Sequence, residues 1–167
     1  MIEQMTFFYS FFTDSKTLIF IVFLFVAFQT SARSDLVDIR VIDGDTVSGT
    51  HFGKVIKIRL AEIDAPEMKQ NFGIQSKKCL KKIIGNSNSP IIFKLKEKDR
   101  YQRSVGWLFS EGKNLNKEMI LQGCAWVYDR YAEDQSFFEA QDFAKKNKLG
   151  LWKTEDPIKP WIWRRKN

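Results

Sequence analysis

Short alternating runs of apolar and polar residues fill much of the chain after residue 35. Residues 36–50 alternate and break at Asp43-Gly44-Asp45, a favoured hairpin sequence, so this run predicts two strands around a turn. Residues 55–60 alternate again, which directs Arg59 away from the apolar face of the predicted strand. Two further runs predict strands at 91–96 and 104–109.

Three other segments carry apolar residues at helical spacing. The first covers residues 74–84 and ends at Gly85, and the second covers residues 116–122 and ends at Gly123. The third opens at Ser136-Phe137-Phe138-Glu139, a capping-box pattern, and ends near Gly150. Short strands with segregated helices predict an α+β domain built on a small barrel.

The N-terminal segment differs in composition from the rest of the chain. Residues 17–28 are apolar and uncharged, Lys16 precedes them, and Thr30-Ser31-Ala32 follows with small residues. This pattern predicts a signal peptide over residues 1–32, or alternatively an N-terminal membrane anchor, followed by one domain over 33–167. We therefore expect a secreted or periplasmic protein, or one anchored and facing outside the cytoplasm.

Charge and cysteine content refine this picture. The chain has a formal net charge of +7, and residues 33–167 carry 26 basic against 18 acidic side chains. A basic surface favours a polyanionic partner, although charge alone also fits a solubility role. Cys79 and Cys124 are the two cysteines. Their apolar neighbours favour buried thiols, with a disulfide as the alternative in an oxidising compartment.

The C-terminal tail, residues 156–167, contains two prolines, Trp161, Trp163 and the run Arg164-Arg165-Lys166. We expect the tail to wrap over the domain, with the tryptophans packed and the basic tip solvated. Stacking of the tryptophans on nucleic-acid bases is the alternative.

Candidate chemistry lies in three phrases rather than in histidine pairs. His51 is the single histidine of the sequence, so mechanisms that need two histidines are excluded. We expect His51 to lie at the surface in a turn. The phrases are Ile42 to Thr46, Arg59 to Glu67, and Asp99 to Arg103. Their carboxylates can hold a hard cation and their arginines can grip a phosphate. Asp-Gly alone could be only a turn, but the ordered trio indicates phosphodiester chemistry.

These phrases, together with residues 116–123, 125–131 and Gly150-Leu151-Trp152, resemble the staphylococcal nuclease family over residues 36–152. The resemblance implies a five-stranded OB-type β-barrel with about three α-helices. It also implies the site: Asp45 and Asp64 as Ca²⁺ ligands with the carbonyl of Ala65; Glu67, Arg59 and Arg103 as catalytic residues; and Arg100, Tyr101 and Tyr131 as nucleotide contacts. Asp129 departs from the family by replacing a second tyrosine.

The resemblance further implies a function. We expect a monomeric, calcium-dependent, sugar-nonspecific endonuclease that hydrolyses DNA and RNA to 3′-phosphate ends, favours single strands and needs no stable protein partner. The alternative is a catalytically inactive nucleic-acid-binding OB-fold module.

Overall fold

The structure, a computed structural model, describes residues 35–167. The predicted leader over residues 1–32 lies outside the described residues, so its cleavage stays a prediction. Among the described helices, none has the length and apolarity needed to cross a bilayer.

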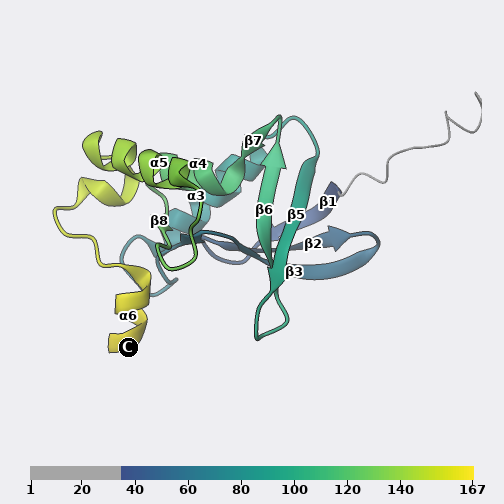
Figure 1. The fold of residues 1–167 in the computed structure, drawn as a ribbon, viewed down its shortest axis with the longest axis horizontal. Helices are drawn as coiled ribbons and strands as arrows, with labels where there is room; N and C mark the ends of the chain where they lie inside the picture. The colour runs from purple at the N-terminus through teal and green to yellow at the C-terminus, as the bar shows by residue number, and fades with distance from the viewer. Residues whose placement is uncertain (1–34) are drawn as a thin grey trace, which may run out of the picture. The chain divides into compact units, whose positions relative to one another are not determined.

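Five strands of the described chain close into a barrel (Figure 1). They are β1 (Asp35–Val41), β2 (Thr46–His51), β3 (Lys54–Leu60), β5 (Ile91–Lys98) and β6 (Ser104–Ser110). Antiparallel neighbours run in the order β3-β2-β1-β5-β6, and a parallel pairing of β3 with β6 completes the circle. The barrel confirms the predicted α+β, OB-type fold.

Shorter elements complete the domain. The strands β4 (Ile63–Asp64) and β8 (Trp126–Val127) form a two-stranded antiparallel ribbon, and β7 (Lys113–Asn114) pairs antiparallel with the end of β6. The helices are α3 (Gly73–Gly85), α4 (Leu115–Leu121), α5 (Gln135–Lys146) and α6 (Pro160–Lys166), with a 3₁₀ turn, η1, at Gly150–Lys153. Figure 1 shows α3, α4 and α5 gathered together and α6, in yellow, at the C-terminus.

The core forms where the barrel's inward side chains meet the apolar faces of the helices. Ile58 and Leu60 of β3 and Leu108 of β6 are almost fully buried, as strand alternation requires. Met119 of α4 and Phe137 of α5 cover them from the helical side. This packing fixes the ends of β3 and β6, which carry the candidate site.

One buried polar side chain ties these parts together. The Asn116 amide nitrogen donates to the carbonyls of Ala61 (3.0 Å) and Gly106 (3.1 Å), and its amide oxygen accepts from the N–H of Leu108 (3.1 Å). Asn116 is fully buried, so losing these bonds would leave several polar groups without partners. It anchors α4 to β6 and to the segment that leads into β4.

The two cysteines form a disulfide, so the expectation of buried thiols is wrong. Cys79 lies on α3 and Cys124 precedes β8, 45 positions later. The hydroxyl of Ser76 also donates to the carbonyl of Cys124 at 2.7 Å. The sequence did not show that α3 lies beside the segment between α4 and β8, which carries Cys124.

Two of three local predictions are wrong in detail. The N-cap of α5 is Asp134, whose carboxylate accepts from the N–H of Ser136 at 2.8 Å, so the expected capping box lies inside the helix. The prediction that the first helix ends at Gly85 is confirmed. His51 ends β2 and is half-buried, with its ring edge-on to Phe93 at 5.3 Å, rather than free at the surface.

Candidate active site

The hairpin turn before β2 positions the first carboxylate. The N–H of Asp45 donates to the side chain of Asp43 at 3.0 Å, which closes a local turn. A Cβ at Gly44 would collide with the side chains of Ser76 and Ala65. Glycine is therefore needed for close packing against α3, which goes beyond the turn preference visible in the sequence.

The second phrase lies against this turn. Asp64 of β4 pairs with Trp126 of β8, and the next residue, Ala65, donates its N–H to Asp45 Oδ2 at 2.6 Å. Asp64 is fully buried in the fold, with its side chain 1% exposed. Asp45, in the turn before β2, and Asp64, on β4, thus approach each other, as the sequence predicted.

Arg59 bridges the two aspartates. Its Nη1 lies 2.9 Å from Asp45 Oδ2 and its Nη2 lies 2.7 Å from Asp64 Oδ1. The side chain points away from the apolar row of β3, as expected, and is only 14% exposed. A planar guanidinium fork suits this paired geometry better than a lysine would.

The third phrase reaches the same place through the parallel pairing of β3 with β6. Arg59 pairs with Val105, and Arg103 lies two residues earlier on the same face. Within its own loop, Arg103 Nε lies 2.7 Å from Asp99 Oδ2. Burial acts to raise the pKa of Asp99, but hydrogen bonds from Arg103 and Tyr101 outweigh it and lower that pKa. Asp99 therefore orients Arg103, a role the sequence analysis missed.

All nine predicted site residues line one cavity of about 850 Å³. Near its rim, Arg100 and Arg103 place their guanidinium carbons 4.8 Å and 5.6 Å from the ring centre of Tyr101. Tyr131 lies edge-on to Tyr128 with ring centres 4.8 Å apart. The cavity therefore combines an acidic floor with cationic and aromatic walls, whereas Asp129 does not line it.

The cavity contains one further charged residue that the sequence analysis placed elsewhere. Arg164 of α6 lies 2.8 Å from Asp64 Oδ2 through Nη2 and 2.8 Å from Glu67 Oε1 through Nη1. Burial acts to lower the pKa of Arg164, but hydrogen bonds to both acids raise it above its ordinary range. The prediction of a solvated tip is wrong for this residue, because nothing local in the sequence shows where the tail docks.

The donor set fits a hard divalent cation. Within residues 35–167, no group of three His, Cys, Asp or Glu side chains forms a ready-made metal cluster. Asp45 and Asp64 supply carboxylate oxygens and Ala65 a backbone carbonyl, which are ligand types that Ca²⁺ accepts. Two guanidinium groups already neutralise these acids, so the chemistry of the pocket favours positive charge.

Burial raises the pKa of Asp45 to about 7, with the carboxylates of Asp43 and Asp64 adding to the effect and Arg59 and the N–H of Ala65 opposing it. Unfolding restores an ordinary value near 3.8. The folded state therefore loses stability as the pH rises from about 4 through about 7 in the absence of metal.

Asp45→Asn should remove this penalty. In chelator at pH 8 we expect the variant to be more stable than the wild type by about 2–4 kcal/mol, with no gain at pH 4. Urea denaturation at both pH values measures the free energy of unfolding. The control is Asp156→Asn, a substitution of an exposed aspartate. Equal effects of Asp45→Asn at the two pH values would contradict the proposed penalty.

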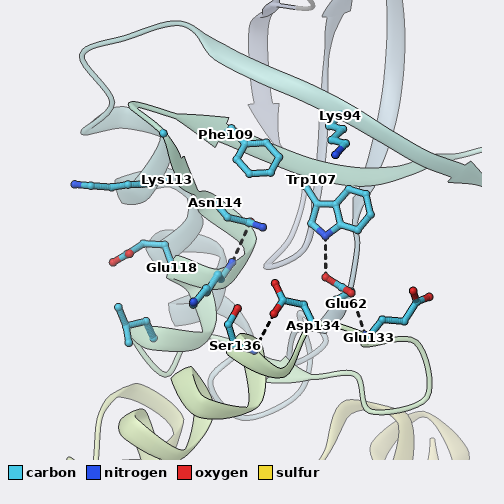
Figure 2. A pocket seen from close by; sticks show the side chains of 13 residues that line it. Glu62, Lys94, Trp107, Phe109, Lys113, Asn114, Glu118, Glu133, Asp134 and Ser136 are labelled. Carbon is cyan, nitrogen blue, oxygen red and sulfur yellow. Dashed lines mark hydrogen bonds between the residues drawn. The ribbon is translucent and has the colours of Figure 1, made fainter.

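A second cavity, of about 790 Å³, lies beside Trp107 and the start of α5 (Figure 2). Trp107 Nε1 donates to one carboxylate oxygen of Glu62 at 2.8 Å, and the other oxygen accepts from the N–H of Glu133 at 3.1 Å. The lining includes both acids and lysines: Glu62, Glu118, Glu133, Asp134, Lys94, Lys113 and Lys117. Its lining contains no arginine and none of the predicted site residues, so the first cavity is the candidate active site.

Comparison with known proteins agrees with this geometry. The family described as "Staphylococcal nuclease homologue" matches residues 57–154. An "Uncharacterized endonuclease" of Haemophilus influenzae is 43% identical over 128 residues, covering 76% of this chain and 71% of the relative. A "Micrococcal nuclease" of Shigella flexneri is 33% identical over 138 residues, covering 76% and 78%. The chain therefore belongs to the staphylococcal nuclease family of phosphodiester hydrolases.

Proposed function

We propose that this nuclease is a calcium-dependent, sugar-nonspecific endonuclease that leaves 3′-phosphate ends on DNA and RNA. The observation that carries the proposal is the convergence of Asp45, Asp64 and Glu67 with the fork of Arg59 in one cavity. A site for phosphodiester hydrolysis must bind a cation and an anionic phosphate together. The carboxylates can bind the cation, and the guanidinium group beside them can bind the phosphate.

In this proposal Asp45, Asp64 and the carbonyl of Ala65 hold Ca²⁺. The cation would supply Lewis-acid stabilisation of charge on the phosphate oxygens. Calcium is favoured over Mg²⁺ because two carboxylates, a carbonyl and waters form a loose shell, whereas Mg²⁺ demands tight octahedral geometry.

The chain's own residues then divide the remaining work. Glu67 accepts the proton of the attacking water as the water oxygen bonds to phosphorus. Arg59 and Arg103 hold the phosphate oxygens, on which negative charge builds. The bond from phosphorus to the 5′-oxygen breaks, that oxygen takes a proton from solvent water and leaves as a hydroxyl, and the phosphate stays on the 3′ side.

The rim of the cavity would bind the nucleotides themselves. Arg100, Tyr101 and Tyr131 are exposed there and offer cationic and aromatic surfaces for phosphates and splayed bases. Phosphates and base faces occur in both DNA and RNA, which supports a nuclease indifferent to the sugar. Exposed stacking surfaces also favour single strands over stacked duplex.

We also propose export of a monomer, with residues 1–32 as a signal peptide. The disulfide between Cys79 and Cys124 supports this proposal, because disulfides persist in oxidising compartments outside the cytoplasm. Mass spectrometry of the protein recovered outside the cytoplasm measures whether the leader is removed. Recovery of the intact chain in membranes would favour the anchored form.

The first test measures acid-soluble fragments released from denatured DNA and from RNA by the purified protein. We expect cleavage of both with calcium, loss of cleavage with chelator, and recovery when calcium is restored. Slower cleavage of intact duplex would support the strand preference. Tight binding without cleavage would instead indicate a nucleic-acid-binding module.

A further inference from the structure

The C-terminal tail is fastened to the loop that carries Glu67. Gln70 accepts a hydrogen bond from the N–H of Glu67 at 3.2 Å through its side-chain oxygen. The same amide group donates through its nitrogen to the carbonyl of Ile158 at 2.6 Å. Gln70 and Pro160 are both buried, so this junction holds α6 beside the active site.

Aromatic stacking adds a second attachment. The ring of Trp161 stacks on Tyr128, which lines the active-site cavity, with ring centres 5.2 Å apart and planes 18° from parallel. Trp126 lies edge-on to Trp161 at 6.2 Å, and the ammonium of Lys159 lies 5.1 Å from the Trp161 ring centre. The prediction that this tryptophan packs against the domain is confirmed, and the packing aims α6 into the cavity.

The helix presents Arg164 to the carboxylate that would ligate the metal. Arg164 contacts both oxygens of Asp64, at 2.8 Å and 3.2 Å, and Arg59 takes Oδ1 as well. The Arg164 fork also engages Glu67 Oε1 at 2.8 Å. Both oxygens of Asp64, and one of Glu67, are thus committed to guanidinium groups.

We propose that Arg164 is an internal competitor of the divalent cation, so that α6 sets the calcium concentration at which the site becomes active. The proposal rests on the proposed function, because it takes Asp64 as a metal ligand. A dication approaching Asp64 meets a positive charge at hydrogen-bonding distance and must displace it. Binding of calcium and docking of Arg164 are therefore mutually exclusive.

The exposure of the two partners fits a displaceable contact. The Asp64 side chain is 1% exposed and fixed by the fold, whereas the Arg164 side chain is 39% exposed on the last helix of the chain. Arg164 can therefore leave into solvent while Asp64 stays in place. The anchors at Gln70 and Trp161 would keep Arg164 near the site for return when calcium is withdrawn.

Calcium affinity tests the proposal without relying on turnover. Isothermal titration calorimetry compares the wild type with Arg164→Ala, with Arg165→Ala as matched control, since Arg165 is an exposed neighbour on α6 without a described ion pair. We expect Arg164→Ala to bind calcium about 10- to 100-fold more tightly, the range of a typical coupling between two exclusive ligands. Arg165→Ala should match the wild type.

Each other result would overturn the proposal in a distinguishable way. Equal or weaker calcium binding by Arg164→Ala would show that Arg164 does not compete, while the calcium site itself would stand. Absence of calcium binding by the wild type and by Arg164→Ala alike would overturn the calcium assignment and the competition together. Arg164→Lys, which keeps one charge but loses the fork, should bind calcium with intermediate affinity and serves if Arg164→Ala fails to fold.

Discussion

Arg59→Lys should lower kcat for cleavage of denatured DNA by about 10³-fold, the order expected when a guanidinium that stabilises transition-state charge is lost. The reason lies in the geometry of the fork. Arg59 spans Asp45 and Asp64 with two different nitrogens, at 2.9 Å and 2.7 Å. A lysine keeps the positive charge but has a single nitrogen, so it cannot contact both aspartates and a phosphate at the same time.

Calcium affinity separates this catalytic role from a structural one. Because lysine keeps the charge beside the aspartates, we expect the calcium Kd of Arg59→Lys to stay within a few-fold of the wild type. Arg40→Lys, at an exposed position on β1, is the matched control and should leave kcat and calcium affinity unchanged. Near-normal kcat in Arg59→Lys would show that Arg59 serves only as a counter-ion to the aspartates.

The strands and the acidic and basic phrases were predictable because each leaves a local pattern. Alternation predicted the five long strands within one to a few residues at each end, since side chains on a barrel face the core at every second position. Eight of the nine predicted residues lie in the phrases around Asp45, Asp64 and Arg103, the family resemblance added Tyr131, and all nine line one cavity. The resemblance to the nuclease family linked phrases that lie far apart in the chain, in the turn before β2, from β3 to just after β4, and in the loop between β5 and β6.

What the sequence did not predict depends on contacts between distant segments. The strands β4 and β8 have two residues each, too few to show alternation, yet their pairing places Asp64. The Cys79–Cys124 disulfide and the buried amide of Asn116 likewise join elements whose proximity only the packed fold reveals. The sequence would point to Asn116 as a residue that joins these elements only if its burial were known in advance.

The docking of Arg164 is the most consequential of these long-range contacts. A run of basic residues after tryptophans is typical of a solvated tail, and all three members are exposed, but only Arg164 among them forms a described ion pair. The different fate of Arg164 comes from the anchors at Ile158 and Trp161, which set the position of the helix. The same acids that would bind the metal attract the nearest guanidinium.

Glu67→Gln should lower kcat by about 10²- to 10⁴-fold, the range expected when a general base is removed. Glutamine keeps the shape and one acceptor oxygen but cannot take a proton from the attacking water. Because Glu67 acts on the water rather than on the nucleic acid, the Kd for uncleaved DNA should change little. Single-turnover kinetics and a binding assay measure the two quantities, with Glu111→Gln in an exposed turn as control.

The double variant Arg59→Lys/Glu67→Gln shows whether the two residues act in one step. If Glu67 deprotonates the water while Arg59 stabilises the same transition state, the combined loss in log kcat should be smaller than the sum of the single losses, because groups that act as a unit are not additive. Additive losses would mean that the residues act independently. An unchanged kcat in Glu67→Gln alone would contradict the general-base role and leave the ion pair with Arg164 as the described role of the Glu67 side chain.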